Sequence, residues 1–357
     1  MKKICILSAV NIKHMSMISM YTDKLDEEGI EYDIIYMDKY GIDEDINART
    51  KYVFRNPINH SNPRIVKALQ YFKFRGFATR ILTENSYGFV IVWNDIAIFM
   101  FSDVLVRKFP GKYCLNIRDY LRQQNGFVYN RFKKAIEGSA FTTISSNGFK
   151  TFLPDYDYIT VHSLNNRLLK NVEPNENFQQ LPKPIRITFL GNVRFFDINK
   201  KLLEVFKNDP RFELHFYGTN GGVLETFALE EGISNTKFYD SFPVEDTPKF
   251  IEQMDLVNNL YGNNSVALKH ALSIKLYYGV YKRCPILVNS DTYGAEIVSK
   301  YGIGYVVSEV NEELPDNVFD WYRNLNFNRF DENCERFLRD IRTENGRFEA
   351  RLREVLL

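Results

Sequence analysis

The sequence has few cysteines, no long apolar run and almost no net charge. Its 4 cysteines among 357 residues lie far apart, with neither the C-x-x-C or His spacing of a zinc site nor the pattern of a disulfide framework. No apolar run approaches the ~18 residues of a membrane-spanning helix. The formal charge of +1 argues against a dedicated nucleic-acid binder, which is usually strongly basic. These absences favour a soluble, cytoplasmic globular protein.

The first residues begin like an export signal but do not continue as one. Met1–Ser8 is basic and then apolar, but Asn11, Lys13 and His14 interrupt the apolar region before it reaches the length that such a signal needs. We therefore expect no export signal, which argues against a two-lobed solute-binding protein of the cell exterior.

Short apolar runs rich in β-branched and aromatic residues alternate with helical patterns along the chain. In the first half this predicts strands at 3–10, 32–38, 51–55, 87–93, 112–117, 141–145 and 158–162, and helices at 14–28, 63–82 and 96–109. The next stretch is rich in Asn, Glu, Gln and Pro, as linkers are. The alternation then restarts, with strands at 185–190, 212–217, 237–239, 256–261, 285–289 and 304–307, and helices at 198–207, 223–231, 244–254, 274–282, 295–300, 316–325 and 331–357.

This alternation predicts an α/β protein with two doubly wound, Rossmann-like domains, since such spacing favours right-handed crossovers and parallel sheets. We expect an N-terminal domain at 1–165, a linker at 166–184, a second domain at 185–325 and a helical segment at 326–357 that crosses back to the first domain. Ligands of open α/β sheets bind at the carboxyl ends of the strands. The site is therefore expected in the strand-to-helix loops, with the two domains facing each other across a cleft.

Positive charge is concentrated in residues 51–150, which hold 16 Lys and Arg against 5 Asp and Glu. Such a block suggests a local anionic partner. Within it, residues 67–80 interleave aromatics with cations. On a helix this mixture can rest on an anionic bilayer at the inner face of the cell membrane, or it can pack its aromatics inward and its cations outward.

Three loops of the second half are candidate phosphate sites. The first strand there ends at Gly191 and is followed by Arg194; a glycine lets backbone approach a ligand and an arginine fork suits phosphate. A second loop begins at Gly218 and Thr219, between a strand and a helix. In the third, Ser273 is a good N-cap, which leaves the N–H groups of Ile274 and Lys275 free at a positive helix end. Each loop can equally be an ordinary turn.

Taken together, these segments resemble the donor-binding half of a GT-B glycosyltransferase. The resemblance is closest to retaining family 4 enzymes of bacterial capsular and surface polysaccharide synthesis. It is carried, in family order and spacing, by 187–194, 212–218, 237–242, 256–261, 273–285, 286–289 and 292–298. In the first half, Arg118-Asp119 and 145–149 are similar to the acceptor side of such enzymes.

The resemblance implies a metal-independent hexosyltransferase that moves a sugar from a nucleoside diphosphate donor, expected to be UDP, to a glycan or a lipid-linked acceptor. Arg194 and Lys275 are the candidates for stabilising the leaving diphosphate, because fixed cations stabilise charge that develops in the transition state. The candidate donor-binding residues are Gly191, Gly218, Thr219, Ser273, Ile274 and Tyr278. His14 and Arg118 are candidates on the acceptor side.

The chain departs from the family pattern where the family carries paired glutamates, because His270 and Tyr278 occupy these positions. Arg283-Cys284 replaces a usual glycine, and the loop at 10–14 lacks one. Two alternatives therefore stay open beside the retaining enzyme. One is an inverting transferase with Asp119 as the base; the other is a GT-B-like binding subunit without catalytic activity.

Overall fold

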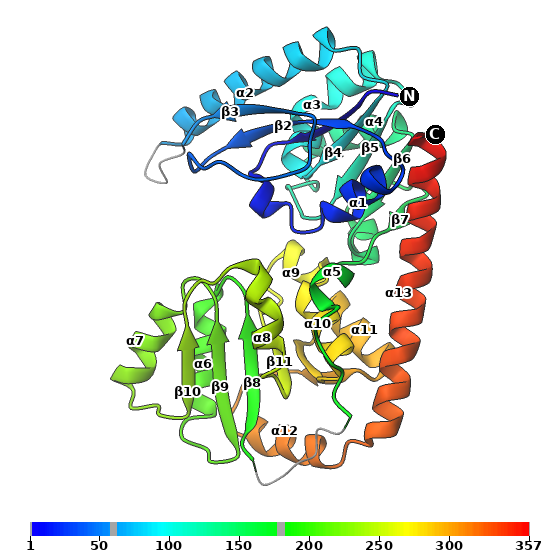
Figure 1. Ribbon diagram of the computed structural model, residues 1–357. Helices are drawn as coiled ribbons and strands as arrows, with labels where there is room; N and C mark the ends of the chain where they lie inside the picture. The colour runs from blue at the N-terminus through cyan, green and yellow to red at the C-terminus, as the bar shows by residue number, and fades with distance from the viewer. Residues whose placement is uncertain (1, 58–62, 177–182, 357) are drawn as a thin grey trace. The chain divides into compact units, whose positions relative to one another are not determined.

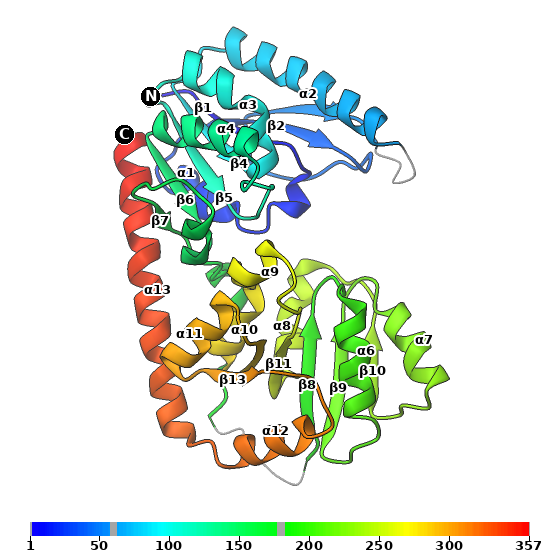
Figure 2. The same ribbon diagram turned by 180° about the vertical axis from the view of Figure 1, so that it is seen from behind.

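The computed structural model describes residues 2–57, 63–176 and 183–356. The chain forms two compact units (Figures 1 and 2). Unit 1 comprises Met1–His162 and Thr343–Leu357, and unit 2 comprises Ser163–Arg342. Of the expected linker, residues 177–182 lie outside the described part of the chain.

Unit 1 is built on a parallel sheet of seven strands in the order β3-β2-β1-β4-β5-β6-β7. Its central strands are buried along their whole length, as expected for a parallel sheet covered on both faces. The strands are β1 (Ile4–Ser8), β2 (Tyr32–Asp38), β3 (Thr50–Arg55), β4 (Phe89–Trp93), β5 (Tyr113–Ile117), β6 (Phe141–Ile144) and β7 (Ile159–Thr160).

The helices of unit 1 cover both faces of its sheet. Helices α2, α3 and α4 lie side by side on one face (Figure 1). On the other face Tyr21 of α1 packs edge-on against Trp93 of β4 and against Phe348 of α13. The helices are η1 (Ile12–His14), α1 (Ser19–Glu27), α2 (Arg64–Glu84), α3 (Asp95–Lys108), α4 (Gly126–Glu137) and η2 (Asn147–Thr151).

Unit 2 repeats the plan with six parallel strands in the order β10-β9-β8-β11-β12-β13. The strands are β8 (Ile185–Leu190), β9 (Phe212–Tyr217), β10 (Thr236–Tyr239), β11 (Leu256–Asn259), β12 (Ile286–Asn289) and β13 (Gly304–Val307). The helices are α5 (Asn166–Leu169), α6 (Phe196–Val205), α7 (Gly222–Glu230), η3 (Val244–Asp246), α8 (Thr247–Ile251), α9 (Val266–His270), α10 (Ile274–Lys282), α11 (Tyr293–Tyr301) and α12 (Leu314–Arg323). The long α13 (Phe327–Leu356) begins in unit 2 and ends in unit 1.

The two parallel sheets confirm the predicted α/β class with two doubly wound units. Three local expectations differ from the structure. The helix expected at 14–28 begins only at Ser19, because the 3-10 turn η1 precedes it. No helix was predicted between 261 and 274, but this polar stretch contains α9, which Ser265 caps by accepting a bond from the N–H of Leu268. Helix α4 was not expected; Asn125 caps it with bonds from Phe127 and Val128.

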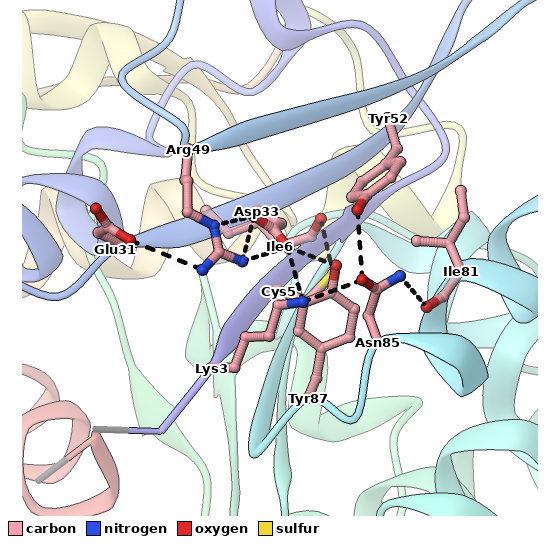
Figure 3. A network of polar contacts seen from close by, with 10 residues as sticks. All are labelled: Lys3, Cys5, Ile6, Glu31, Asp33, Arg49, Tyr52, Ile81, Asn85 and Tyr87. Atoms are coloured by element: carbon pink, nitrogen blue, oxygen red, sulfur yellow. Dashed lines mark hydrogen bonds and ion pairs between the residues drawn. The ribbon is translucent and has the colours of Figure 1, made fainter.

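A buried ion network joins the first strands of unit 1 at the edge where they begin. Asp33 of β2 has no exposed surface and accepts bonds from Arg49 at 2.8 Å and from the Tyr87 hydroxyl at 2.8 Å (Figure 3). Burial acts to raise the pKa of Asp33, but the bonds from Arg49 and Tyr87 outweigh it and lower this pKa. The network therefore stabilises the starts of these strands, at the edge of the unit 1 sheet opposite to the carboxyl ends of its strands.

All four cysteines are buried and free. Over the described residues, no helix is both long and apolar enough to cross a membrane. The same residues contain no group of three or more His, Cys, Asp or Glu side chains placed to hold a metal ion.

Candidate functional site

Two glycine loops of unit 2 lie against each other where β8 and β9 end. The N–H of Gly191 donates to the carbonyl of Tyr217 at 2.8 Å, and the N–H of Val193 donates to that of Thr219 at 2.9 Å. Gly191 and Gly218 have φ angles of +112° and +138°, which favour glycine. A Cβ on Gly218 would lie 2.1 Å from the carbonyl oxygen of Gly191. Only glycine fits there, so this close approach depends on Gly218.

Arg194 is exposed and projects from a loop whose backbone is tightly held. The next residue, Phe195, has a left-handed φ of +60°, which is uncommon outside glycine. The buried Asn199 donates to the carbonyls of Arg194 and Phe195 at 3.2 and 3.0 Å. Its own carbonyl accepts a bond at 3.2 Å from Asn258 of β11. Asn199 and Asn258 therefore position Arg194, and the sequence analysis missed both because buried amides carry no pattern of their own.

Lys275 lies in the first turn of α10, and its side chain is surrounded by aromatic side chains. Ser273 caps this helix by accepting a bond from the N–H of Lys275 at 3.3 Å. The side chain of Lys275 is buried, and its Nζ donates to the hydroxyl of Tyr261. This nitrogen also lies 3.9 Å from the ring centroid of Phe189 and 4.4 Å from that of Tyr261. The ammonium group is thus held by π faces and one hydroxyl.

The positive charge of Lys275 is buried beside a second cation, Arg194. Burial and then the positive charge of Arg194 lower the pKa of Lys275 to about 7. Among the described residues, no carboxylate forms an ion pair with Lys275 or Arg194. The structure therefore brings the two cations within electrostatic range, and a bound anion would relieve the cost of a buried, unpaired ammonium.

The remaining donor-side candidates lie at the same edge of the sheet, with different exposure. Thr219 is exposed, and Ile274, the first residue of α10, is half-buried. Tyr278, one turn further, is 7% exposed and belongs to the hydrophobic core of unit 2. His270 ends α9 and is half-buried; burial and then Lys269 lower its pKa.

In unit 1, Arg118 and Asp119 directly follow β5, and a buried carboxylate holds their backbone. Asp95, at the start of α3, is 4% exposed and accepts bonds from the N–H groups of Arg118 at 3.3 Å and Asp119 at 3.1 Å. Burial and then the charge of Asp119 raise the pKa of Asp95 to about 8. Asp119 itself is exposed. The sequence analysis missed Asp95, although Asn94, which caps α3, marks this strand-to-helix turn.

His14 lies in a different cluster of unit 1. Its Nε2 is 2.9 Å from the hydroxyl of Tyr40, and the side chain is exposed. Burial of part of the ring and then Lys13 lower the pKa of His14. The carboxylate of Glu44 binds the N–H groups of Ile12 and Lys13 at 3.0 and 2.7 Å, so the loop after β1 is occupied by an acidic side chain of the chain itself.

A scan against protein-family models and a search of curated proteins found no match. Among solved structures, the chain is similar to HepE of Anabaena in complex with UDP and glucose, with 11% identity, TM-score 0.70, and coverage of 99% of this chain and 100% of that one. It is similar to the lipopolysaccharide outer core galactosyltransferase WaaB, with 13% identity, TM-score 0.62 and coverage of 98% and 99%. It is also similar to a proposed UDP-N-acetylglucosamine 2-epimerase from Listeria monocytogenes, with 12% identity, TM-score 0.61 and coverage of 94% and 91%. At these identities the likeness establishes the fold: the chain has the two-domain, Rossmann-like GT-B fold.

Proposed function

We propose that this chain is a glycosyltransferase that moves a hexosyl group from a nucleoside diphosphate sugar to a glycan or a lipid-linked acceptor in surface polysaccharide synthesis. UDP is the proposed nucleotide. Support for UDP comes from HepE, which was solved with UDP and glucose, and from the proposed epimerase, whose name contains a UDP sugar. Support for the acceptor class comes from the sequence resemblance and from the name of WaaB.

One observation carries this proposal: at the carboxyl edge of the unit 2 sheet, the ammonium of Lys275 is buried within range of Arg194 and forms no ion pair with a carboxylate of the described residues. A nucleoside diphosphate supplies the missing negative charge. The two cations belong to different loops, so they can bind different oxygens of one diphosphate. The neighbouring Gly191–Gly218 contact keeps side chains away from the same edge.

The proposed chemistry follows from where charge develops. As the bond between the sugar C1 and the diphosphate oxygen breaks, negative charge grows on the leaving group, and Arg194 and Lys275 stabilise it more than the bound substrate. The acceptor oxygen forms the new bond to C1. In a retaining reaction its proton passes to the departing phosphate oxygen, and no metal ion is required for these steps.

On the acceptor side we propose His14, Arg118 and Asp119, all in unit 1. An inverting reaction would use Asp119 as the general base, which removes the proton from the acceptor hydroxyl. The exposed position of Asp119 beside the buried Asp95 supports this alternative.

A specific observation also supports the non-catalytic alternative. His270 and Tyr278 stand where the resembled enzymes carry glutamates, and Tyr278 is 7% exposed in the core. A chain that lost these carboxylates can keep nucleotide binding and lose transfer.

Turnover separates these proposals. The chain is incubated with a panel of UDP sugars, with and without oligosaccharide or lipid-linked acceptors, and the released UDP and the anomer of the product are measured. Acceptor-dependent UDP release that is lost in Arg194→Ala supports the transferase, and the anomer distinguishes retention from inversion. If the chain binds UDP but forms no UDP from any UDP sugar, with any acceptor, the result supports the binding subunit. Conversion of a UDP sugar without acceptor would contradict both.

We also propose peripheral contact with an anionic membrane through residues 67–80 on α2. The side chains of Ile65, Leu69 and Phe72 recur at helical spacing and are 75%, 56% and 73% exposed, whereas Phe74 is fully buried. A paired Leu69→Ser, Phe72→Ser variant is expected to lose sedimentation with anionic vesicles. The matched control, Val223→Ser with Leu229→Ser, removes exposed apolar side chains of α7 in unit 2 and should leave sedimentation unchanged; equal loss in both would contradict the proposal.

A further inference from the structure

Three arginines of unit 1 converge on one carboxylate, that of Asp103 in α3. Its oxygens lie 2.6 Å from Arg75 of α2, 3.0 Å from Arg131 of α4 and 3.1 Å from Arg107 of α3. Burial acts to raise the pKa of Asp103, but Arg75 and then Arg131 outweigh it and lower this pKa. Asp103 therefore stays ionised at neutral pH, yet its single charge balances only one of the three cations.

A surface hollow of about 490 Å³ opens beside this cluster, between α3 and α4. Its lining includes Asp103, Arg107, Arg131, Lys134, Asn130 and Phe127. Three cations thus face the hollow against one carboxylate. An excess of fixed positive charge in a concave surface concentrates anions from solution.

The arginines are held in place by contacts that leave donors free. Nε of Arg131 donates to the carbonyl of Phe99 at 2.9 Å, and its guanidinium lies 5.2 and 5.9 Å from the ring centroids of Phe99 and Phe127. Nε of Arg107 donates to the carbonyl of Asp103 at 3.0 Å. A guanidinium carries five N–H donors, so both arginines retain donors after these bonds and the bonds to Asp103. Positioned forks of this kind suit the oxygens of phosphate.

We propose that the hollow between α3 and α4 binds a phosphate group, at a site separate from the donor loops of unit 2. The phosphate can be carried by the headgroup of an anionic lipid or by a soluble phosphorylated compound. The ring of Phe127 at the rim is 65% exposed, which gives a lipid-borne phosphate an apolar neighbour. The site depends on the charges of α3 and α4 and not on the proposed sugar transfer.

The test compares two variants that each remove two positive charges from unit 1. The hollow variant carries Arg107→Gln and Lys134→Gln; both side chains are exposed, and Asp103 keeps its bonds to Arg75 and Arg131. The control carries Lys112→Gln and Lys150→Gln, two exposed lysines outside the hollow. The first arm measures sedimentation with vesicles of phosphatidylcholine, with and without phosphatidylglycerol. The second measures the melting-temperature increase caused by inorganic pyrophosphate, with every variant also carrying Arg194→Ala so that the donor loops contribute little.

If the phosphate is lipid-borne, the control binds phosphatidylglycerol vesicles like the unaltered chain and the hollow variant binds at least about tenfold more weakly. If it is soluble, the melting-temperature increase disappears in the hollow variant alone. Equal behaviour of the hollow variant and the control in both arms would overturn the site. Melting temperatures without ligand are measured first, so that a folding defect is recognised.

Discussion

The Nζ of Lys275 donates a hydrogen bond to the hydroxyl of Tyr261 and lies 4.4 Å from the centroid of the same ring. Both contacts suit an ammonium group, but neither neutralises it. Burial lowers the pKa of Lys275 to about 7, so keeping this group charged costs free energy in the free protein. In the proposed function, a bound diphosphate removes this cost. Several properties of the chain depend on this cost.

Replacing Lys275 with methionine is expected to stabilise the free protein and to weaken UDP binding. The pKa of Lys275 is about 7 in the folded protein, against its ordinary value of 10.5. The group therefore destabilises the folded state most below about pH 7, and this destabilisation disappears as the pH rises toward 10.5. At about pH 6 the variant should therefore melt a few degrees higher than the unaltered chain, in a thermal denaturation assay. Lys237→Met, at an exposed lysine, is the control and should not show this increase. A lower melting temperature for Lys275→Met would show that the ammonium stabilises the fold instead.

The affinity for UDP is expected to fall as the pH rises above about 7. Below that pH Lys275 is protonated in the free protein; above it, binding must take up a proton, which costs up to tenfold in affinity per pH unit. A phosphate group has completed its own ionisation by then, because its second pKa is about 6. Titration calorimetry across this range measures the effect, and in Lys275→Met the decline should be absent. A decline of the same size in that variant would assign it to another group.

Asp95→Asn is expected to remove a pH dependence of stability. The pKa of Asp95 is raised from 3.8 to about 8, so its contribution to stability is fully present below about pH 4 and is lost as the pH rises toward 8. The slope from this one group is at most about 1.4 kcal/mol per pH unit. Denaturant unfolding at several pH values should show a flatter profile in the variant.

Asp119→Asn serves as the companion change to Asp95→Asn, because the charge of Asp119 is the second cause of the raised pKa of Asp95. Removing the charge of Asp119 lowers the pKa of Asp95, so in Asp119→Asn the loss of stability ends at a lower pH than in the unaltered chain and is smaller in total. Unfolding profiles of Asp119→Asn that coincide with those of the unaltered chain would contradict the coupling between the two carboxyl groups.

Asn199→Ala is expected to weaken UDP binding indirectly, through the position of Arg194. The amide holds the carbonyls of Arg194 and Phe195 and keeps Phe195 in its left-handed conformation. Loss of the amide leaves buried polar groups without hydrogen bonds, which lowers the free energy of unfolding by about 1–3 kcal/mol. It also allows the loop that carries Arg194 to move. Thermal denaturation and UDP titration are measured together. Asn199→Asp, which keeps the size but not the donor, should behave like the alanine variant; unchanged UDP affinity in both would remove the positioning role of Asn199.

Much of the fold could be predicted from sequence because buried parallel strands are continuous apolar runs, as in β1 and β4. Helix α10 was predicted with its observed bounds, since Ser273 marks its start. Helix α4 was missed although its buried Phe132, Ala135 and Ile136 recur at helical spacing, because its cap, Asn125, lies in a polar stretch that conceals the start of the helix.

The candidate site could be predicted only in part. Gly191, Arg194 and Lys275 stand in strand-to-helix loops, where α/β sheets bind ligands. Asp95 and Asn258 act through contacts with residues far apart in the sequence, which no local pattern reveals. Asn199 binds the nearby carbonyls of Arg194 and Phe195, but the left-handed turn that brings them together is visible only in the structure. Arg283 shows the same limit: it adopts the left-handed φ of +64° that a glycine would favour and forms ion pairs with Asp331 and Glu335 of α13.

The most direct test of the account is a calorimetric comparison of UDP with uridine, on the unaltered chain, Arg194→Ala and Lys275→Met, at about pH 6, where Lys275 is protonated. If the two cations hold the diphosphate, the unaltered chain binds UDP far more tightly than uridine, and each variant loses at least about tenfold of that preference while its affinity for uridine is unchanged. Equal preference for UDP in all three proteins would contradict a diphosphate site at Arg194 and Lys275.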